Sequence, residues 1–432
     1  MKTRVSVAFP ASKADEPTWP YMNYDVEERS NEVLLVLGEQ LPDFEFVPSI
    51  LHSVEEAEDL IRGDTDNFDG YLVYMTSLWT KIEEVFARKA YPVVIADDPF
   101  AGSGGILSVN SIIRRESLPV VTVSSSNFGD VVDAVRLFEV MKRLRESRIL
   151  VVTDRNCEDG RVVEPLGTKI ACMNSVEFRK FYDGVPDDEA KRCAESWISG
   201  AKDVIEPDED EITRSAKIFL AMREAMSQKN ADAITVDCLG LYYSDKLPAY
   251  PCLGFFQLNN EGSTGVCEAD TRSTLCQLVF RYLTGRPAYV SDPVIDTAAN
   301  QIVYAHCVST NRVFGPGGLS NPYVIRSHAE DLKGASVQSL MPLGEAVTTI
   351  QINPEKRAIS IHNAETVANI HDEKGCRTKL AATVDAQTVF DNYHFELFSW
   401  HRVTCYGNHR DSIMKLARIY GLEVFEEDRA FS

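Results

Sequence analysis

The segment from Glu268 to Asp292 constrains the fold more strongly than any other part of the chain, because it reads as one helix followed by one short strand. Apolar residues recur at positions i, i+3, i+4 and i+7 through residues 271–284, and this period predicts a helix. Asp270 or Thr271 offers an N-cap, Gly285 ends the helix, and residues 288–291 are typical of a strand.

The lengths of these two elements predict that the two carboxylates meet. The helix descends roughly 21 Å at about 1.5 Å per residue, and the strand climbs back about 16 Å at about 3.3 Å per residue. Glu268 and Asp292 are therefore expected at the carboxyl edge of one parallel sheet, where open α/β sheets bind ligands. Two carboxylates placed together repel each other unless a cation or a shared proton lies between them. The alternative is that both side chains only cap and solvate loop ends.

A hairpin is predicted directly after this segment. The loop is residues 297–300, and the alternating run 301–306 returns along the preceding strand. This pairing places Asp292 opposite or diagonal to His306, at about 5–8 Å, and Pro293 restricts it to an edge strand. Two carboxylates and an imidazole together form a site suited to a divalent cation. A strand-end histidine with a plain core or surface role is the alternative.

The rhythm of the chain predicts three regions, in line with a length of 432 residues. Short apolar runs alternate with amphipathic helices in the first half, whereas short alternating strands with turns dominate from about residue 288. We expect a Rossmann-like α/β domain over residues 1–146 and a second over 147–287, which carries the first metal carboxylate. A β-rich, barrel-like domain follows over 288–432. Its final strand, expected over residues 395–405, and the helix after it return to the metal site.

Composition excludes several classes of partner. The formal net charge of −21 argues against nucleic acid and anionic membranes, and no run of eighteen apolar residues offers a membrane span. The apolar run at residues 5–9 is too short for a signal peptide. Ten cysteines without a Cys-x-x-Cys pair are expected to be reduced thiols. These features predict a cytoplasmic protein.

Several short stretches carry a family resemblance through their joint order and the 24-residue interval from 268 to 292, although no single one is specific. They are Cys267-Glu268-Ala269-Asp270, Ser291-Asp292, Ala305-His306-Cys307, Ile325-Arg326-Ser327-His328-Ala329-Glu330 and Trp400-His401-Arg402-Val403. Together they resemble the L-fucose isomerase / L-arabinose isomerase superfamily over roughly residues 230–426, and the N-terminal half is more weakly similar.

The resemblance implies a divalent metal site. In that family a Glu and an Asp or second Glu bind the metal, usually manganese, and also act as acid and base. A late histidine in a His-x-x-x-x-Tyr-Gly-like stretch completes the site. Carried over to this chain, the ligands are Glu268, Asp292 and His401, and His306 matches a further histidine of the arabinose branch. Mn²⁺ is the expected ion, and Mg²⁺ or Zn²⁺ also suits mixed oxygen and nitrogen ligands.

Four further residues are expected to contact the substrate. Arg326 and His328 alternate onto one face of a strand that borders the substrate in the resembled family. His409 is the alternative ligand to His401 and is expected beside the sugar. Tyr242 lies in the segment that leads to Glu268. A plain strand-end role for His328 and a core role for Tyr242 are the alternatives.

The activity that the resemblance implies is metal-dependent aldose–ketose isomerisation of a small free sugar, of the pentose or 6-deoxyhexose type, through a cis-enediol. One carboxylate would remove a proton from carbon and the other would return it, beside a metal that acidifies the carbon. The chain is shorter than the typical fucose enzyme and has Asp where the arabinose enzyme has Glu, so the sugar stays open. The alternatives are another metal-dependent sugar-converting enzyme (an epimerase, lyase or glycosidase) and a non-catalytic sugar-binding protein. A homo-oligomer, trimeric or hexameric, is also implied.

Overall fold

The computed structural model describes residues 2–12, 19–64 and 67–430. The chain divides into two compact units, of which the first is Met1–Arg143 with Asp411–Glu423 and the second is Leu144–Arg410 with Val424–Ser432. The predicted domain boundaries after residues 146 and 287 remain predictions. In the part of the chain that the structure describes, we find no helix long and apolar enough to cross a membrane.

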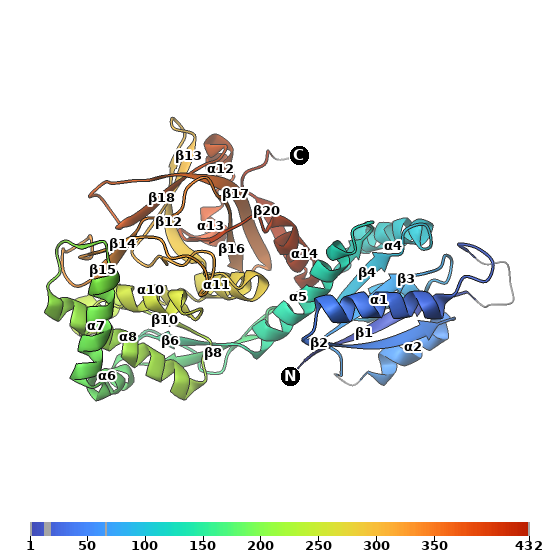
Figure 1. Cartoon of the computed structure of the whole chain (residues 1–432), viewed down its shortest axis with the longest axis horizontal. Coiled ribbons are helices and arrows are strands. Elements are labelled where there is room, and N and C mark those ends of the chain that lie inside the picture. The colour runs from blue at the N-terminus through green and yellow to red at the C-terminus, as the bar shows by residue number, and fades with distance from the viewer. Residues whose placement is uncertain (1, 13–18, 65–66, 431–432) are drawn as a thin grey trace. The chain divides into compact units, whose positions relative to one another are not determined.

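The first unit contains a parallel α/β sheet, as the rhythm of the sequence predicted (Figure 1). Its strand order, β2-β1-β3-β4-β5, is a doubly wound order that reverses direction between β1 and β3. The strands are β1 (Thr3–Pro10), β2 (Phe44–Leu51), β3 (Gly70–Met75), β4 (Val93–Asp97) and β5 (Val120–Val123). The helices are α1 (Val26–Gln40), α2 (Val54–Gly63), α3 (Ile82–Lys89), α4 (Ser103–Glu116), α5 (Gly129–Glu146), whose last residues belong to the second unit, and α14 (Arg410–Tyr420).

The second unit begins with another α/β sheet, in the order β11-β10-β6-β8-β7, which is parallel except for the antiparallel β7. Its strands are β6 (Arg148–Val152), β7 (Val162–Val163), β8 (Thr168–Met173), β10 (Ala233–Val236) and β11 (Thr264–Cys267). Its helices are α6 (Ser175–Gly184), α7 (Asp187–Gly200), α8 (Glu209–Lys229), α9 (Cys238–Tyr243), α10 (Cys252–Asn260) and α11 (Thr271–Thr284).

Helix α11 has the predicted bounds and connects the parallel sheet to the next one. Asp270 caps its N-terminus by accepting the backbone N–H groups of Arg272 and Ser273, and Gly285 ends it with a φ of 68°. The helix contacts β10 and β11 of the parallel sheet as well as β16 and β19 of the following sheet (Figure 1). It is buried along most of its length, so its period of apolar residues reflects two packing partners.

Most of the remaining strands form a closed antiparallel barrel, which confirms the predicted β-rich region. Hydrogen bonding follows the ring β16-β19-β12-β13-β18-β17 and closes between β17 and β16, while β20 adds to β17. The barrel strands are β12 (Tyr289–Asp296), β13 (Gln301–His306), β16 (Ala346–Asn353), β17 (Ala358–Asn369), β18 (Thr378–Thr383), β19 (Arg402–Tyr406) and β20 (Glu423–Glu426). A smaller sheet, β15-β14-β9, and two short helices complete the unit: β9 (Asp203–Val204), β14 (Tyr323–Arg326), β15 (Ser336–Ser339), α12 (Ala386–Asp391) and α13 (Phe395–Phe398).

The strand that carries Asp292 belongs to the barrel and not to the parallel sheet, contrary to the prediction. β12 pairs with β13 and β19, and both pairings are antiparallel. Pro293 does not make β12 an edge strand, because the pairing with β19 uses residues 289–291 and ends before the proline. The local sequence pattern identified the strand correctly, but it contains no information about which strands would become its neighbours.

The predicted strand over residues 395–405 is also wrong in its first half. Phe395–Phe398 forms the short helix α13, and Ser399 follows with φ 62° and ψ −159°. Strand β19 begins only at Arg402, so His401 lies immediately before the strand instead of within it.

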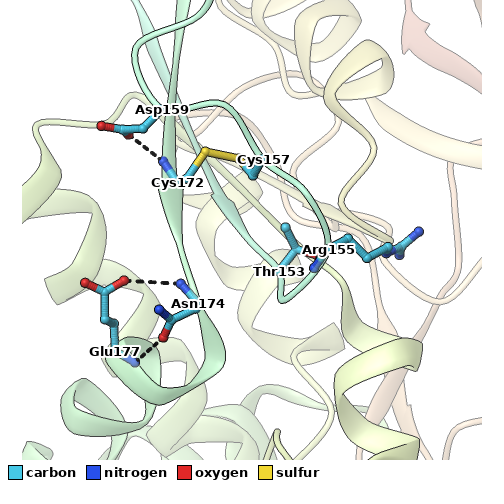
Figure 2. Close-up of a disulfide and its surroundings, with 7 residues drawn as sticks. All are labelled: Thr153, Arg155, Cys157, Asp159, Cys172, Asn174 and Glu177. Carbon is cyan, nitrogen blue, oxygen red and sulfur yellow. Dashed lines mark hydrogen bonds between the residues drawn. A yellow bond between two sulfur atoms is a disulfide. The ribbon is translucent and has the colours of Figure 1, made fainter.

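Two cysteines that were expected to be reduced form a disulfide. Cys157, in the loop after β6, is bonded to Cys172 in β8 (Figure 2). The other eight cysteines are free. The expectation failed for this pair because the two cysteines, 15 residues apart, meet only when the chain between them folds back through β7.

Candidate metal centre

Four of the residues predicted as metal ligands come together from four different elements. Glu268 directly follows β11, at the carboxyl edge of the second parallel sheet. Asp292 lies within β12, His306 ends β13, and His401 precedes β19. The register pairs Asp292 with Ala305, which brings the neighbouring His306 beside the carboxylate. The site therefore joins the edge of the sheet to the barrel within one compact unit.

The donor atoms of these residues form a ring. His306 Nε2 lies 3.8 Å from Glu268 Oε1 and 3.9 Å from Asp292 Oδ2. His401 Nε2 lies 3.6 Å from Glu268 Oε2 and 3.4 Å from Asp292 Oδ1. Ligand atoms about 2.0–2.3 Å from one ion are roughly 3.0–3.7 Å apart. Small side-chain adjustments would therefore let these donors converge on a divalent cation.

The ring of His401 is oriented by Asp270. His401 Nδ1 donates to Asp270 Oδ2 at 2.7 Å, which leaves Nε2 facing the carboxylates as the acceptor of a neutral ring. Burial alone would lower the pKa of His401, but the hydrogen bond and charge of Asp270, with Glu268 and Asp292, raise it to about 9. Without a metal, a proton on Nε2 therefore offsets part of the negative charge at this site.

His306 differs from His401 in its protonation state. It is fully buried, and burial together with the neighbouring His401 lowers its pKa to about 3, so the ring is neutral. The backbone N–H of Cys307 donates to His306 Nδ1 at 2.9 Å, which leaves the proton of the neutral ring on Nε2. His306 therefore points an N–H toward the carboxylates, and coordination through Nε2 requires the Cys307 contact to be given up.

In this environment the pKa of both carboxyl groups is raised. Burial raises the pKa of Glu268, and the nearby Asp292 and Asp270 raise it further. Burial also raises the pKa of Asp292, and Glu330 adds to it. Their side chains nevertheless keep 38% and 46% of their surface exposed, so a small molecule can reach both. A pair of accessible carboxylates with raised pKa values is typical of acid–base chemistry.

The backbone at Glu268 is held in an uncommon conformation. Glu268 and Ala269 have φ values of 64° and 52°, and two consecutive non-glycine residues in the left-handed region cost about 1–2 kcal/mol each. A hydrogen bond from the Ala269 N–H to the Val236 carbonyl, 2.9 Å long, holds this turn against β10. Strain of this kind is concentrated at functional sites.

Cys267 is the other ligand type nearby, because its Sγ lies 3.5 Å from His306 Nε2. Cys267, Glu268 and His306 form one possible ligand group, and Asp292, His306 and His401 form another. Burial raises the pKa of the Cys267 thiol well above its ordinary value, so the thiol keeps its proton as long as no metal is bound.

His328 and Tyr242, which were predicted to contact the substrate, belong to one stack of rings. Tyr250 lies between them, with ring centroids 3.9 Å from Tyr242 and 4.3 Å from His328. His328 is buried, and its Nδ1 has no hydrogen-bond partner within the described residues. A buried polar atom without a partner costs free energy, so a ligand that contacts it would be favoured.

Arg326 and His409 are placed differently. The guanidinium of Arg326 is engaged by Glu206 and Glu373, at 2.6 and 2.9 Å. His409 Nε2 contacts the backbone carbonyl of Tyr406 at 3.0 Å, beyond the far end of β19. The five residues of β19 span roughly 16 Å, so the structure separates His409 from His401.

Two hollows adjoin the ligand ring. The first has a volume of about 400 Å³ and is mostly aromatic and apolar; its lining is Asp292, Pro293, Ile295, Phe390, Tyr393, Phe395 and Trp400. The second, about 460 Å³, borders Glu268 and includes Arg155 and Lys246. Both of these cations are already paired, Arg155 with Asp237 and Lys246 with Asp154 at 2.7 Å. Figure 2 shows Arg155 and Thr153 on the loop that the Cys157–Cys172 disulfide ties to β8.

The sequence reading missed two kinds of residue. Asp270 was recognised only as a helix cap, although its second oxygen orients His401. A carboxylate two positions after Glu268 was the signal that could have suggested this. The aromatic hollow was missed as well, although three large apolar side chains between residues 390 and 400 are exposed: Phe390, Phe395 and Trp400.

Comparison with known proteins gives a distant relationship. No protein-family model matches the chain. Among proteins with an assigned function, the chain is similar to a sulfoquinovose isomerase of Alkalicoccus urumqiensis, with 22% identity over 384 residues. The aligned region covers 80% of this chain and 82% of that protein. The chain is thus a distant relative of a sugar isomerase.

Proposed function

We propose that this protein is a metal-dependent aldose–ketose isomerase that acts on a small free sugar through a cis-enediol. The ring of four donors formed by Glu268, His306, Asp292 and His401 carries this proposal, because neighbouring donor atoms are 3.4–3.9 Å apart. The distant similarity to a sugar isomerase supports the reaction class. The finer statement, a pentose or 6-deoxyhexose substrate, is also part of the proposal.

Glu268, Asp292 and His401 would hold the metal, and His306 would join them once its ring gives up the Cys307 contact. Mixed oxygen and nitrogen ligands favour Mn²⁺ or Mg²⁺, and Zn²⁺ is compatible with the same set. When bound, such an ion would polarise the two sugar oxygens next to the reacting carbons and acidify the carbon-bound proton.

The proton transfers fall to the two carboxylates. One of Glu268 and Asp292 would accept the proton from C2 of the aldose, and a carboxyl group would return it at C1. The O2 hydroxyl would lose its proton and O1 would gain one, which gives the ketose. The raised pKa of each group suits this exchange, because a carboxylate with a higher pKa is a stronger base. Both groups are partly exposed, so they can approach carbon atoms of a bound sugar.

The rest of the sugar would lie between the ring stack and the aromatic hollow. His328 Nδ1, which is buried and has no hydrogen-bond partner among the described residues, would contact a sugar hydroxyl, and Tyr242 borders it through Tyr250. The C–H faces of a sugar pack well against aromatic rings, and Trp400 offers such a face beside His401. A homo-oligomer, trimeric or hexameric, belongs to the same proposal, and light scattering of the purified protein would measure it.

The test is a reaction in D₂O with a panel of aldoses, using protein stripped of metal and then reloaded with Mn²⁺. We expect a ketose product and deuterium at C2 of the recovered aldose, because a cis-enediol exchanges its proton with solvent. Glu268→Gln should abolish both signals, whereas Glu365→Gln, at an exposed site on β17, should preserve them.

Other results would redirect the proposal. An epimer or a cleaved sugar as product would favour a different metal-dependent sugar reaction. Sugar binding without any product, equally strong with and without Mn²⁺, would favour a sugar-binding protein.

A further inference from the structure

The guanidinium of Arg402 connects a buried carboxylate to the backbone of the predicted ligand His401. Arg402 Nε and Nη2 donate to Glu427 Oε1 at 3.1 and 2.7 Å. Arg402 Nη1 donates to the carbonyl oxygens of His401 and Ser399 at 2.9 and 3.2 Å. The side chains of Arg402 and Glu427 keep 0% and 1% of their surface exposed, so both charges are fully inside the protein.

A buried ion pair of this kind is a poor source of stability. Removing two charges from water costs much of what their attraction returns, and apolar replacements are often equally stable. The guanidinium of Arg402 is instead placed where it donates both to Glu427 and to backbone carbonyls. Its central carbon lies 3.9 Å from the centroid of the Tyr393 ring. The second oxygen of Glu427 is held by His362 Nδ1 at 2.8 Å, which fixes the carboxylate itself.

The turn that Arg402 holds has an unusual backbone. Ser399 has φ 62° and ψ −159°, a combination that is almost restricted to glycine. Such a conformation persists only where the surroundings hold it in place. Arg402 binds the carbonyls at both ends of the Ser399–His401 turn, and Gln351 Nε2 donates to the His401 carbonyl at 3.1 Å.

We propose that Glu427 is a positioning residue for the metal ligand His401 and acts through Arg402. Asp270 sets the rotation of the His401 ring, while Arg402 and Glu427 set the position of the His401 backbone relative to Asp292. Without the Glu427 carboxylate, the buried guanidinium turns toward other acceptors and releases the two carbonyls. His401 Nε2 then loses its 3.4 Å alignment with Asp292 Oδ1. This inference rests on the proposed function only in naming His401 as a metal ligand.

The experiment compares Glu427→Gln with Glu426→Gln, which makes the same change at the neighbouring carboxylate, whose partners are Arg410 and Arg429. Mn²⁺ affinity is measured by calorimetry, and the His401 ring resonance is followed by NMR in the metal-free, histidine-labelled protein. We expect Glu427→Gln to weaken Mn²⁺ binding about 10-fold or more and to shift the His401 resonance. Glu426→Gln should change the affinity less than about 3-fold and leave the His401 resonance in place.

A second variant keeps the test decisive if Glu427→Gln does not fold. Arg402→Lys retains the ion pair with Glu427 but lacks the fork that also reaches the carbonyls, so it should fold and still show weak Mn²⁺ binding with a shifted His401 resonance. An unchanged resonance and affinity in whichever variant folds would overturn the proposal. If the unaltered protein binds no Mn²⁺, the proposed function fails, and the resonance in metal-free protein still decides whether Glu427 positions His401.

Discussion

Each of the two parallel sheets ends at a carboxyl edge with a hollow beside it, yet the acidic residues at the two edges are in different states. In the first unit, Asp98 follows β4 and is surrounded by donors: Arg29 at 2.8 and 3.1 Å, Tyr24 at 2.9 Å and Tyr74 at 3.0 Å. In the second unit, Glu268 follows β11, and its ion-pair partners in the described chain are two histidines at 3.6 and 3.8 Å.

The difference lies in charge balance. The edge of a parallel sheet attracts ligands in general, and the hollow beside β1, β2 and β3 has a volume of about 500 Å³. At that edge, however, Arg29 neutralises Asp98 within the chain. At the edge of β11, burial and the charge of Asp292 raise the pKa of Glu268, and a protonated His401 offsets part of the negative charge there. An acidic edge becomes a site for a cation when the protein itself does not supply the positive charge.

The largest expected effect is a loss of activity on substitution of carboxylates at the edge of β11, but not at the edge of β4. Glu268→Gln and Asp292→Asn should each lower kcat by about 10²–10⁴-fold and abolish bound Mn²⁺, because each removes a charge that the site needs. Asp98→Asn should keep both the rate and the metal, although it weakens the first unit. Initial rates and elemental analysis after dialysis measure both quantities. Loss of Mn²⁺ in Asp98→Asn, or full occupancy in Glu268→Gln, would show that charge balance does not distinguish the edges.

A second prediction concerns the group that orients His401. Asp270→Asn should weaken Mn²⁺ affinity about 10–100-fold, because the amide keeps the helix cap but removes the charge behind the imidazole. His401→Ala should erase the rise in melting temperature that Mn²⁺ binding produces. His409→Ala is the matched control, since it lies beyond the other end of β19 and should leave that rise intact. If His409→Ala erased the rise and His401→Ala did not, the ligand would be His409.

The third prediction uses pH to contrast the partly exposed carboxylates Glu268 and Asp292 with Glu427, which is buried and paired with Arg402. Burial opposes ionisation of Glu427, but Arg402 and the hydrogen bond from His362 lower its pKa from 4.5 to about 2. A carboxyl group with a lower pKa in the folded state adds stability above its unfolded value, and this contribution is lost as pH falls from about 4.5 to 2. It corresponds to about 3 kcal/mol in the free energy of unfolding.

Urea unfolding between pH 2 and 7 measures this loss. The double variant Arg402→Met/Glu427→Gln removes both charges together, so its unfolding free energy should fall less steeply over that window than that of the unaltered protein. Equal slopes would show that Glu427 titrates with an ordinary pKa.

The smallest effect expected is optical. Trp400 lines the aromatic hollow next to Asp292 and keeps 65% of its surface exposed, so a bound polyol should change its fluorescence by tens of per cent at most. Trp400→Phe should remove the change, whereas Trp79→Phe, in the first unit with its side chain 83% exposed, should retain it. A signal that follows Trp79 instead would place the sugar elsewhere.

The local sequence pattern was sufficient to predict the helices and strands, but it did not predict which strands pair with one another. The period of apolar residues predicted α11 with its correct bounds, and the alternation of runs predicted the sheet of the first unit. The same sequence pattern led us to place β12 in the wrong sheet, because the sequence of a strand of eight residues does not distinguish a parallel sheet from a barrel. The candidate site was assembled from family resemblance and spacing, whereas the contact of Asp270 with His401 spans 131 residues, so the sequence around Asp270 could not identify its partner.

The start of β19 shows a second limit. Residues 395–405 are apolar and aromatic enough for a strand, but Ser399 adopts a backbone that its side chain disfavours. Arg402 donates to the Ser399 carbonyl, and the buried charge of Arg402 is paired with Glu427, which directly follows β20. A conformation that depends on a distant charge cannot be inferred from residue preferences.

The late position of Glu427 has a consequence for how the protein is made. A ribosome adds about 5–20 residues per second, so the 131 residues between Asp270 and His401 take roughly 7–26 s to synthesise. During that interval the nascent chain carries Glu268 and Asp292 without the imidazole that completes their site. The turn at Ser399 is secured only after residue 427 has also emerged. Metal loading is therefore expected as a late event in biosynthesis, and chains arrested between residues 300 and 400 should bind Mn²⁺ only weakly.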